Sequence, residues 1–237
     1  MTSRSEREFD RYAADYEQLL RDPIRDRFAN SSDFFHRRKW DVLSDFLRRG
    51  AVSTRQARWL DVGCGKQELL RLGRHAFAEV AGCDPSDEML HGSADIDLYL
   101  QQDPKVLPFD DECFDLVTAA CVFHHVEPRD RDALTLEVRR VLKPGGLFSV
   151  IEHNPLNPIT QLVVRRSPID VNARLLTAGS ARRLMRRAGF RPLMTTYFLY
   201  LPSKIYAVAS QVERLLGHLP GGGQYAVFAA KHGDSGR

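Results

Sequence analysis

The feature that most constrains the fold of this chain is the segment at residues 58–70, RWLDVGCGKQELL. Residues 59–62 form an apolar run typical of a buried strand, and Gly63-Cys64-Gly65 follows as a glycine-rich turn. From Gln67 onward the residues favour a helix. A strand, a tight Gly-X-Gly turn and a helix N-terminus together predict a pocket for a nucleotide-like ligand. The glycines expose bare backbone to the ligand, and the first helical N–H groups are free to bind it.

Two acidic residues narrow the class of ligand. Asp61 lies two residues before the first glycine, where a carboxylate can hold a cationic group. Asp84 ends the next predicted strand, 19 residues after Gly65, which is the position of an acid that accepts both hydroxyls of a ribose. A third glycine, expected for a dinucleotide, is missing, since Gln67 and Glu68 stand in its place. An adenosine ligand with an amino-acid end, S-adenosyl-L-methionine, suits this pair of acids.

Four motifs then occur in one order along the chain. They read LDVGCG at 60–65, VAGCDPSDEML at 80–90, LPFDDECFDLV at 107–117 and VLKPGGLFSVIE at 141–152. In this order they resemble the class I S-adenosylmethionine-dependent methyltransferases, most of all the subgroup that acts on small molecules. The resemblance covers about residues 40–190. Gln67 departs from it, because the family most often has glycine there.

The resemblance implies a fold and a division of the chain. It implies an α/β, Rossmann-like sheet of seven mostly parallel strands, with helices on both faces and an antiparallel last strand. We expect one domain over residues 1–237: a helical N-terminal cap at 1–50, a cofactor-binding core at 56–153, and a substrate cover with a terminal strand pair at 154–237. The segment FDRYAADY at 9–16 resembles the family's lid, although its aromatic stripe is equally consistent with plain packing on the protein body.

The resemblance also implies the cofactor-binding residues. Asp61 and Asp84 are joined by Asp103, which follows the predicted third strand and would accept the adenine amino group. Pro104 removes the backbone N–H that could have bound the adenine ring. The full expected set is Tyr16, Asp61, Gly63, Cys64, Gly65, Asp84, Pro85, Asp103 and Cys121.

Candidates for a general base follow the fourth and fifth predicted strands. A hydroxyl acceptor needs its proton removed, and histidine is the natural group for that at neutral pH. We expect His153 to be the base, with His124 as the second candidate. His125 is expected to pack, and Glu152 to bind the cofactor or cap backbone. The spacing of these residues matches no common zinc or iron site, so we expect no metal.

Composition excludes several classes of protein. The formal net charge of the 237-residue chain is +3, so the charge balance does not require a nucleic-acid-binding surface. No apolar run approaches the roughly 20 residues that span a bilayer, and the charged N-terminus does not resemble a signal peptide. The four cysteines form no CxxC pair, consistent with reduced thiols in a cytoplasmic protein. We therefore expect a small-molecule acceptor, no nucleic-acid partner, no stable membrane insertion, and a monomer or homodimer.

Other functions stay open at this point. A dinucleotide-dependent oxidoreductase shares the first strand–turn–helix unit, but lacks the terminal strand pair predicted here. A scaffold protein would not need the three acids. A nucleic-acid methyltransferase is disfavoured, since no Asn-Pro-Pro-aromatic or Cys-Pro motif follows the fourth strand. An enzyme of the same fold that binds the cofactor but catalyses a cyclisation or decarboxylation is barely separable by sequence.

Overall fold

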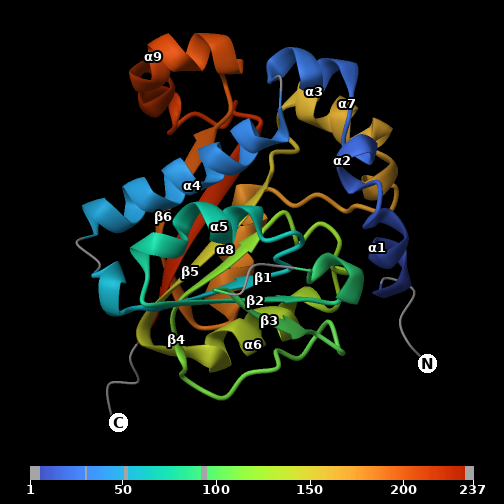
Figure 1. The fold of residues 1–237 in the computed structure, drawn as a ribbon. Helices are drawn as coiled ribbons and strands as arrows, with labels where there is room; N and C mark the ends of the chain where they lie inside the picture. The colour runs from blue at the N-terminus through green and yellow to red at the C-terminus, as the bar shows by residue number, and fades with distance from the viewer. Residues whose placement is uncertain (1–5, 30, 51–52, 92–94, 233–237) are drawn as a thin grey trace.

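The computed structural model describes residues 6–29, 31–50, 53–91 and 95–232. Seven strands form one sheet in the order β3-β2-β1-β4-β5-β7-β6 (Figure 1). Their bounds are β1 Arg58–Val62, β2 Glu79–Asp84, β3 Asp97–Leu100, β4 Phe114–Ala120, β5 Leu142–His153, β6 Phe190–Phe198 and β7 Gln224–Lys231. Only β7 runs antiparallel, to both β5 and β6. The predicted seven-stranded, mostly parallel sheet is therefore confirmed.

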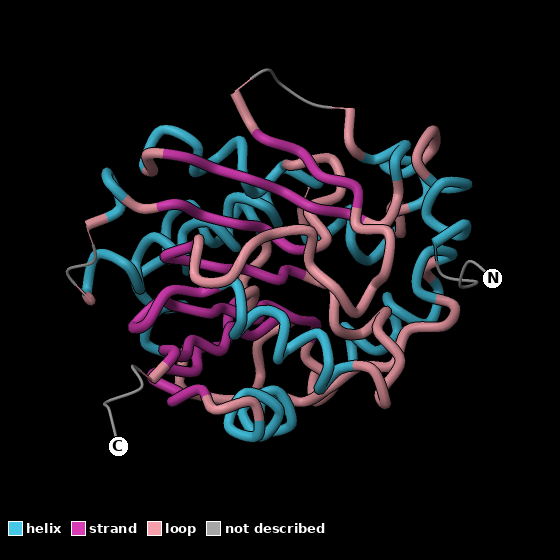
Figure 2. Tube along the Cα trace, turned by 90° about the horizontal axis from the view of Figure 1, so that it is seen from below, coloured by secondary structure: helices cyan, strands magenta, loops and turns pink. Residues whose placement is uncertain are grey.

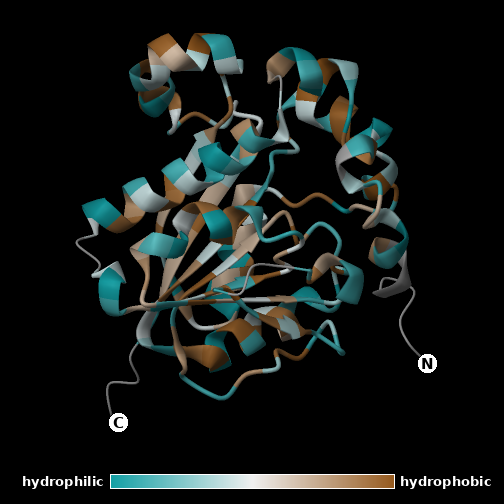
Figure 3. Ribbon diagram, in the orientation of Figure 1, coloured by the Kyte–Doolittle hydropathy of each residue, from teal (hydrophilic) through white to brown (hydrophobic). Residues whose placement is uncertain are grey.

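Helices cover both faces of the sheet, as expected. On one face, α4 (Ser32–Arg49) and α5 (Glu68–Gly73) pack through Leu43, Phe46 and Leu70. On the other, α6 (Arg131–Val141) and α8 (Ala178–Arg187) pack through Val138 and Met185. The central strands are buried on both sides and read as continuous apolar runs. Figure 2 shows the strands side by side among the helices, and Figure 3 shows the polar residues gathered on the outer helical surfaces.

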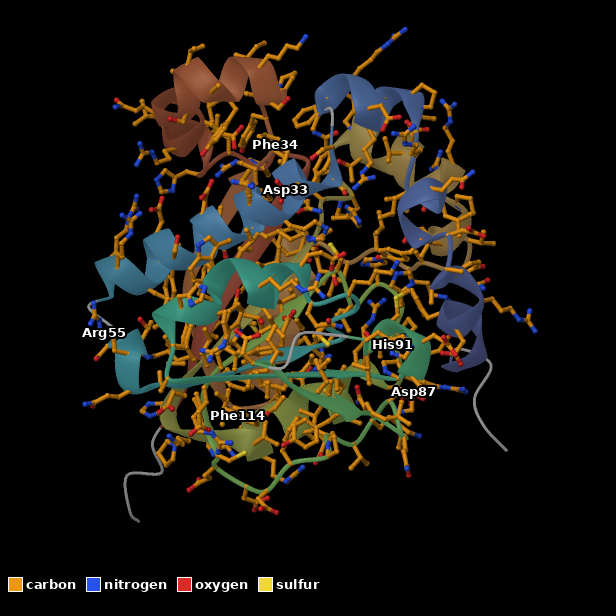
Figure 4. All side chains as sticks on the ribbon, viewed as in Figure 1. Asp33, Phe34, Arg55, Asp87, His91 and Phe114 are labelled. Carbon is orange, nitrogen blue, oxygen red and sulfur yellow. The ribbon has the colours of Figure 1, made fainter. Side chains whose placement is uncertain are left out.

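The N-terminal segment is helical, but it is not the single helix that the sequence pattern over 6–20 indicates. It divides into α1 (Glu6–Tyr12), α2 (Tyr16–Leu19) and α3 (Pro23–Phe28). The hydroxyl of Ser86 donates a hydrogen bond of 2.6 Å to the Asp10 carboxylate on α1. Ser86 immediately precedes the short 3-10 turn η3 (Asp87–Met89), and Figure 4 shows Asp87 on the side of the molecule where α1 lies. Helix α1 therefore packs against the segment that follows β2.

Two local sequence patterns differ from the structure. The sequence Lys-Pro-Gly-Gly at residues 143–146 is typical of a turn before a strand, but these residues belong to the bulged first part of β5. The register to β4 shifts between Phe114 and Leu116, and Gly145 takes a left-handed φ of 77°. Pro85 and Ser86 are typical of the start of a helix, here one reaching Leu90, but the structure has only the short turn η3 at this place. The remaining elements are the 3-10 turns η1 (Thr54–Gln56), η2 (Arg74–Ala76) and η4 (Pro168–Asp170), with helices α7 (Pro158–Arg166) and α9 (Ser203–Leu216).

Strand order places the site. From β1 the chain moves to β2 and β3 on one side, then crosses to β4 on the other side of β1. The carboxyl ends of β1 and β4 therefore lie at the point where the strand order reverses, and ligands of open α/β sheets bind in the crevice outside such a point. Within the described residues, no helix is both long and apolar enough to cross a membrane.

Candidate functional site

A cavity of about 1190 Å³ opens at the carboxyl edge of the parallel strands. Ligand pockets usually measure roughly 300–1,000 Å³, so this one has room for a large ligand, or for two ligands side by side. Its walls come from the loops after β1, β2, β3 and β4, from α1, α2 and α4, and from residues 171–174 beyond η4. The expected cofactor residues all line it: Tyr16, Asp61, Gly63, Cys64, Gly65, Asp84, Pro85, Asp103 and Cys121.

The glycine-rich loop has the conformation that its sequence requires. Gly63 and Gly65 take left-handed φ values of 64° and 50°. A Cβ atom on Gly63 would lie 2.6 Å from a methyl carbon of Val122, so a side chain there would also collide with the loop after β4. Bare backbone thus faces the cavity where the sequence predicted ligand contact.

The contacts of the Gln67 side chain explain why glutamine stands where the family pattern most often has glycine. It is fully buried and has a left-handed φ of 60°, a conformation that costs an L-residue free energy and that glycine adopts freely. Its side-chain amide donates to the carbonyl oxygens of Gly65 at 2.5 Å and of Met89 at 2.8 Å. The glutamine therefore joins the glycine-rich loop to the segment after β2, a connection that glycine could not make.

Asp84 makes a second connection between the same two segments. Its carboxylate accepts hydrogen bonds of 2.9 Å from the backbone N–H groups of Gly65 and Ser86. Burial raises the pKa of Asp84 to about 6, although both of these bonds oppose the shift. The carboxylate lines the cavity and retains acceptor capacity, because a carboxylate has about four lone-pair sites.

Asp61 is the most deeply buried acid of the cavity wall, 3% exposed. It is the register partner of Thr118 on β4, whose hydroxyl lies 2.5 Å from the carboxylate and accepts a hydrogen bond from the indole N–H of Trp59. Burial raises the pKa of Asp61 to about 7 despite the Thr118 bond. Among the described residues no cation lies within 4 Å of this carboxylate, although Lys39 acts on it from farther away and lowers its pKa. A positively charged ligand group would therefore pair with it directly.

The other expected cofactor residues differ in environment. Asp103 is exposed at the cavity rim, and its carboxylate accepts from the N–H of Lys105 at 2.8 Å. Tyr16 on α2 is half-buried, and the pKa of its hydroxyl is raised mainly by burial. Cys121 follows β4 directly with a left-handed φ of 62°. All three residues line the cavity, and their contacts with a cofactor stay a prediction.

The histidines do not lie where the sequence-based order of preference places them. His125 lines the cavity, whereas neither His124 nor His153 does. His124 is 2% exposed, with its Nδ1 2.5 Å from Glu152 and its Nε2 3.3 Å from Asp170. Burial alone would lower the pKa of His124, but these carboxylates raise it to about 10. His124 is therefore protonated at neutral pH and cannot accept another proton.

His125 has the opposite electrostatic environment. Its Nε2 lies 3.4 Å from Asp170, and its ring packs edge-on against Phe9 of α1 with 4.9 Å between centroids. Burial, together with the positive charge on His124, lowers the pKa of His125 to about 3, while Asp170 opposes the shift. The ring is thus neutral at neutral pH and faces the cavity.

Glu152 and Asp170 balance this histidine cluster. Glu152 is fully buried and accepts from the backbone N–H of Phe123 at 2.7 Å. The pKa of each carboxyl is lowered against the effect of burial, chiefly by His124. Nitrogen atoms of His124 and His125 and an oxygen of Asp170 lie within 4.8 Å of one another, a spacing that a metal ion could also use. A protonated His124 between two carboxylates accounts for the arrangement by ion pairing alone.

Sequence reasoning missed two contributors to the cavity wall and its charge, Lys39 of α4 and Asp170 of η4. Lys39 lines the cavity beside His36, and Asp170 reaches the histidine cluster behind the wall. Lys39 is 7% exposed. The basic cluster Arg37-Arg38-Lys39 is typical of a solvated helix face, but Arg38 and Lys39 are buried. The apolar neighbours of Lys39 on α4 were the only available signal, since a lysine among buried helix positions must face inward.

Three comparisons with known proteins agree with the fold. Residues 60–150 match a family described as "Methyltransferase domain". An uncharacterised methyltransferase of Synechocystis is 35% identical over 103 residues, covering 41% of this chain and 48% of that protein. The ubiquinone/menaquinone biosynthesis C-methyltransferase UbiE of Shewanella frigidimarina is 30% identical over 147 residues, covering 51% and 58%. The chain thus spans about half the length of the curated relatives it matches.

Solved structures extend the similarity to nearly the whole chain. A possible histamine N-methyltransferase of Thermotoga maritima superposes with a TM-score of 0.65 at 18% identity, covering 96% of this chain and 99% of that one. The [4+2]-cyclase SpnF superposes with a TM-score of 0.56 at 21% identity, covering 81% of each chain. At such identities the likeness shows the fold alone.

The Gln67 connection can be tested by stability measurements on two variants. Gln67→Ala loses the two hydrogen bonds donated to Gly65 and Met89 and a third accepted from Arg71, and it keeps the left-handed backbone, so we expect it to lower the free energy of unfolding by about 2 kcal/mol. Gln67→Gly loses the same bonds but relieves backbone strain of about 1 kcal/mol, so it should be the more stable variant. Urea unfolding of the three proteins measures both differences. A Gln67→Ala protein as stable as the wild type would show that the Gln67 side chain does not hold the glycine-rich loop to the segment after β2.

Proposed function

We propose that the chain is a class I S-adenosylmethionine-dependent methyltransferase, which transfers a methyl group from S-adenosyl-L-methionine to a small, partly hydrophobic acceptor. The basis is that residues 60–150 match a methyltransferase domain, and that the fold superposes on structures of S-adenosylmethionine-dependent methyltransferases. The observation that carries the proposal is the cavity wall. It brings together two buried acids, Asp61 and Asp84, around a glycine loop whose backbone is bare. One acid suits the ammonium of the cofactor, and the other suits its ribose hydroxyls.

The cofactor, when bound, supplies a methyl group already activated on a sulfonium sulfur. The residues of this chain then need to hold the two reactants in line and keep water out. Asp61, Gly63 and Gly65 would hold the amino-acid end, Asp84 the ribose, and Asp103 the adenine. The part of the cavity wall formed by His125, Val126 and Val171 would take the acceptor, and its mixture of apolar and polar groups supports a partly hydrophobic one.

We propose O-methylation, with His125 as the general base in place of His153 and His124. His125 is the neutral imidazole at the cavity wall, and Asp170 lies where it would stabilise the imidazolium that forms as a hydroxyl proton is accepted. Carbon methylation is the second candidate, supported by the activity in the name of the UbiE relative. A cyclisation on the same fold is an alternative, since fold alone does not fix chemistry.

The proposed cofactor predicts selective stabilisation by ligand. S-adenosylhomocysteine, the product, should raise the melting temperature, because a ligand that binds only the folded state adds about 2.7 kcal/mol of stability at 100 times its Kd. NAD should leave the melting temperature unchanged, since Gln67 and Glu68 occupy the place of the third glycine. Thermal unfolding with each ligand measures this. Stabilisation by NAD and none by S-adenosylhomocysteine would contradict the proposal.

The buried acids predict that cofactor affinity depends on pH. The pKa of Asp61 in the free protein is raised to about 7, and a bound ammonium would lower it. Binding would therefore release a proton near neutral pH, and affinity for S-adenosylhomocysteine should fall, by up to about tenfold per pH unit, as the pH drops below 7. Calorimetric titrations between pH 5.5 and 8.5 test this. The Asp61→Asn variant should bind S-adenosylhomocysteine more weakly, and its affinity should no longer change near pH 7. If the affinity of this variant depended on pH as that of the wild type does, Asp61 would not be the group whose titration controls binding.

The proposed base predicts different outcomes for three histidine variants. An acceptor is first identified by screening hydroxyl, amine and carbon nucleophiles for S-adenosylhomocysteine production. With a hydroxyl acceptor, His125→Ala should lower turnover about 10²- to 10⁴-fold with cofactor affinity nearly unchanged. His153→Ala should retain most of its turnover, and His124→Gln should lose stability through unpaired buried carboxylates. Loss of turnover in His153→Ala but not in His125→Ala would restore His153 as the base.

A further inference from the structure

Cys121 differs from the other three cysteines of the chain in its surroundings. Cys64 and Cys83 are buried, and burial raises the pKa of both thiols. Burial also raises the pKa of the Cys113 thiol. Cys121 lines the cavity and lies where the loop after β4 begins, with its N–H donating to the Ile151 carbonyl at 2.8 Å.

Several groups around the Cys121 sulfur favour a negative charge on it. The side-chain amide of Gln224 on β7 donates to Sγ at 3.6 Å, and His153 at the end of β5 is close enough to act on the thiol electrostatically. Burial alone would raise the pKa of this thiol, but Lys39 and His153 lower it to about 6. Glu152 opposes this shift. Further ionisable groups that act on the sulfur are Tyr16, Arg25, His124 and Tyr225.

Lys39 is an independent observation that points to an anion in the same place. Its side chain comes from the middle of α4, is 7% exposed and lines the cavity. Among the described residues, it makes no hydrogen bond and no ion pair within 4 Å. A buried ammonium without such a partner is costly unless negative charge lies nearby, and both the Asp61 carboxylate and a Cys121 thiolate interact with Lys39 electrostatically.

We propose that Cys121 is a covalent modification site: a thiolate in the cavity wall, set by Lys39, His153 and Gln224, that adds to carbon electrophiles conjugated to a carbonyl group. In this reaction, the sulfur lone pair forms a C–S bond to the β carbon. The alkene π pair moves onto the α carbon and carbonyl as an enolate, which takes a proton from water, so no oxidant or reductant is needed. A thiolate, and not a thiol, is the nucleophile in such additions.

An adduct on Cys121 would occupy the cavity, which gives the modification a consequence for ligand binding. This part rests on the proposed function, because the cavity is there assigned to the cofactor and the acceptor. Cofactor and electrophile would then exclude each other, so the same thiolate would make the enzyme sensitive to electrophilic metabolites.

The experiment is a labelling competition within one molecule. The folded protein is treated with limiting N-ethylmaleimide at pH 6.5 and quenched, and its peptides are quantified by mass spectrometry. Cys121 should react at least tenfold faster than Cys64, Cys83 or Cys113. Equal or faster labelling of Cys113 would overturn the proposal. Glycine suits the left-handed φ at position 121, so Cys121→Gly is the matching variant. Its labelling by N-ethylmaleimide should lack the fast reaction that we assign to Cys121.

Lysine variants test the electrostatic cause. Lys39→Met should slow labelling of Cys121 about tenfold at pH 6.5 and much less at pH 9, where the thiol ionises without help. Lys66→Met is the matched control: Lys66 also lines the cavity, but its ammonium lies 6.0 Å from the centre of the Tyr16 ring. The labelling rate of Cys121 in the Lys66→Met variant should equal the rate in the wild type. An unchanged rate in Lys39→Met, with its fold confirmed by thermal unfolding, would overturn the role of Lys39.

Ligand protection separates this proposal from the proposed function. Saturating S-adenosylhomocysteine should slow the labelling of Cys121. Binding of S-adenosylhomocysteine without any protection would overturn the exclusion between cofactor and adduct. If S-adenosylhomocysteine does not bind at all, the proposed function fails, whereas selective labelling of Cys121 would still establish the thiolate site.

Discussion

The glycine-rich loop after β1 is the constraint on which the site depends. The loop must turn left-handed at Gly63, Gly65 and Gln67 to expose its backbone to the cavity, and each such turn costs conformational freedom. Two buried side chains hold it there. Asp84 accepts from the N–H of Gly65, and Gln67 donates to its carbonyl oxygen, so both peptide groups of one glycine are fixed by neighbours. The loop is thereby positioned before any ligand arrives, which lowers the entropic cost of binding.

A second set of interactions organises the side of the cavity assigned to the acceptor. His124 lies between Glu152 and Asp170, and its N–H groups and charge satisfy two carboxylates that would otherwise be buried unpaired. The same arrangement connects β5 and the segment at η4 to the loop after β4, and the Arg174 N–H adds a bond of 2.7 Å to the His124 carbonyl. His125 is carried to the cavity by that loop. The adjacent histidines thus separate into one structural cation and one neutral imidazole facing the cavity.

Much of the fold could be predicted because its determinants are local in sequence. The apolar strands, the Gly-X-Gly turn and the acid that ends β2 each depend on a few adjacent residues, and their order along the chain indicated both the sheet and the cofactor pocket. The helix breaks near Tyr12 and the bulge at Gly145 were missed because packing, and not propensity, decides them. The sides to which His124 and His125 point could not be derived, since the left-handed backbone at Cys121 ends the alternation of β4. Asp170 comes from 45 residues farther along the chain, and no sequence pattern places it beside His125.

The central claim is that the glycine loop and the two buried acids form the site of S-adenosylmethionine. A crystal structure of the protein with S-adenosylhomocysteine tests this most directly. The account predicts both ribose hydroxyls within hydrogen-bond distance of the Asp84 carboxylate, the amino-acid end beside Asp61 and Gly63, and the sulfur directed toward Cys121 and His125. A ligand bound elsewhere, or bound in this cavity with its ribose away from Asp84, would contradict the account.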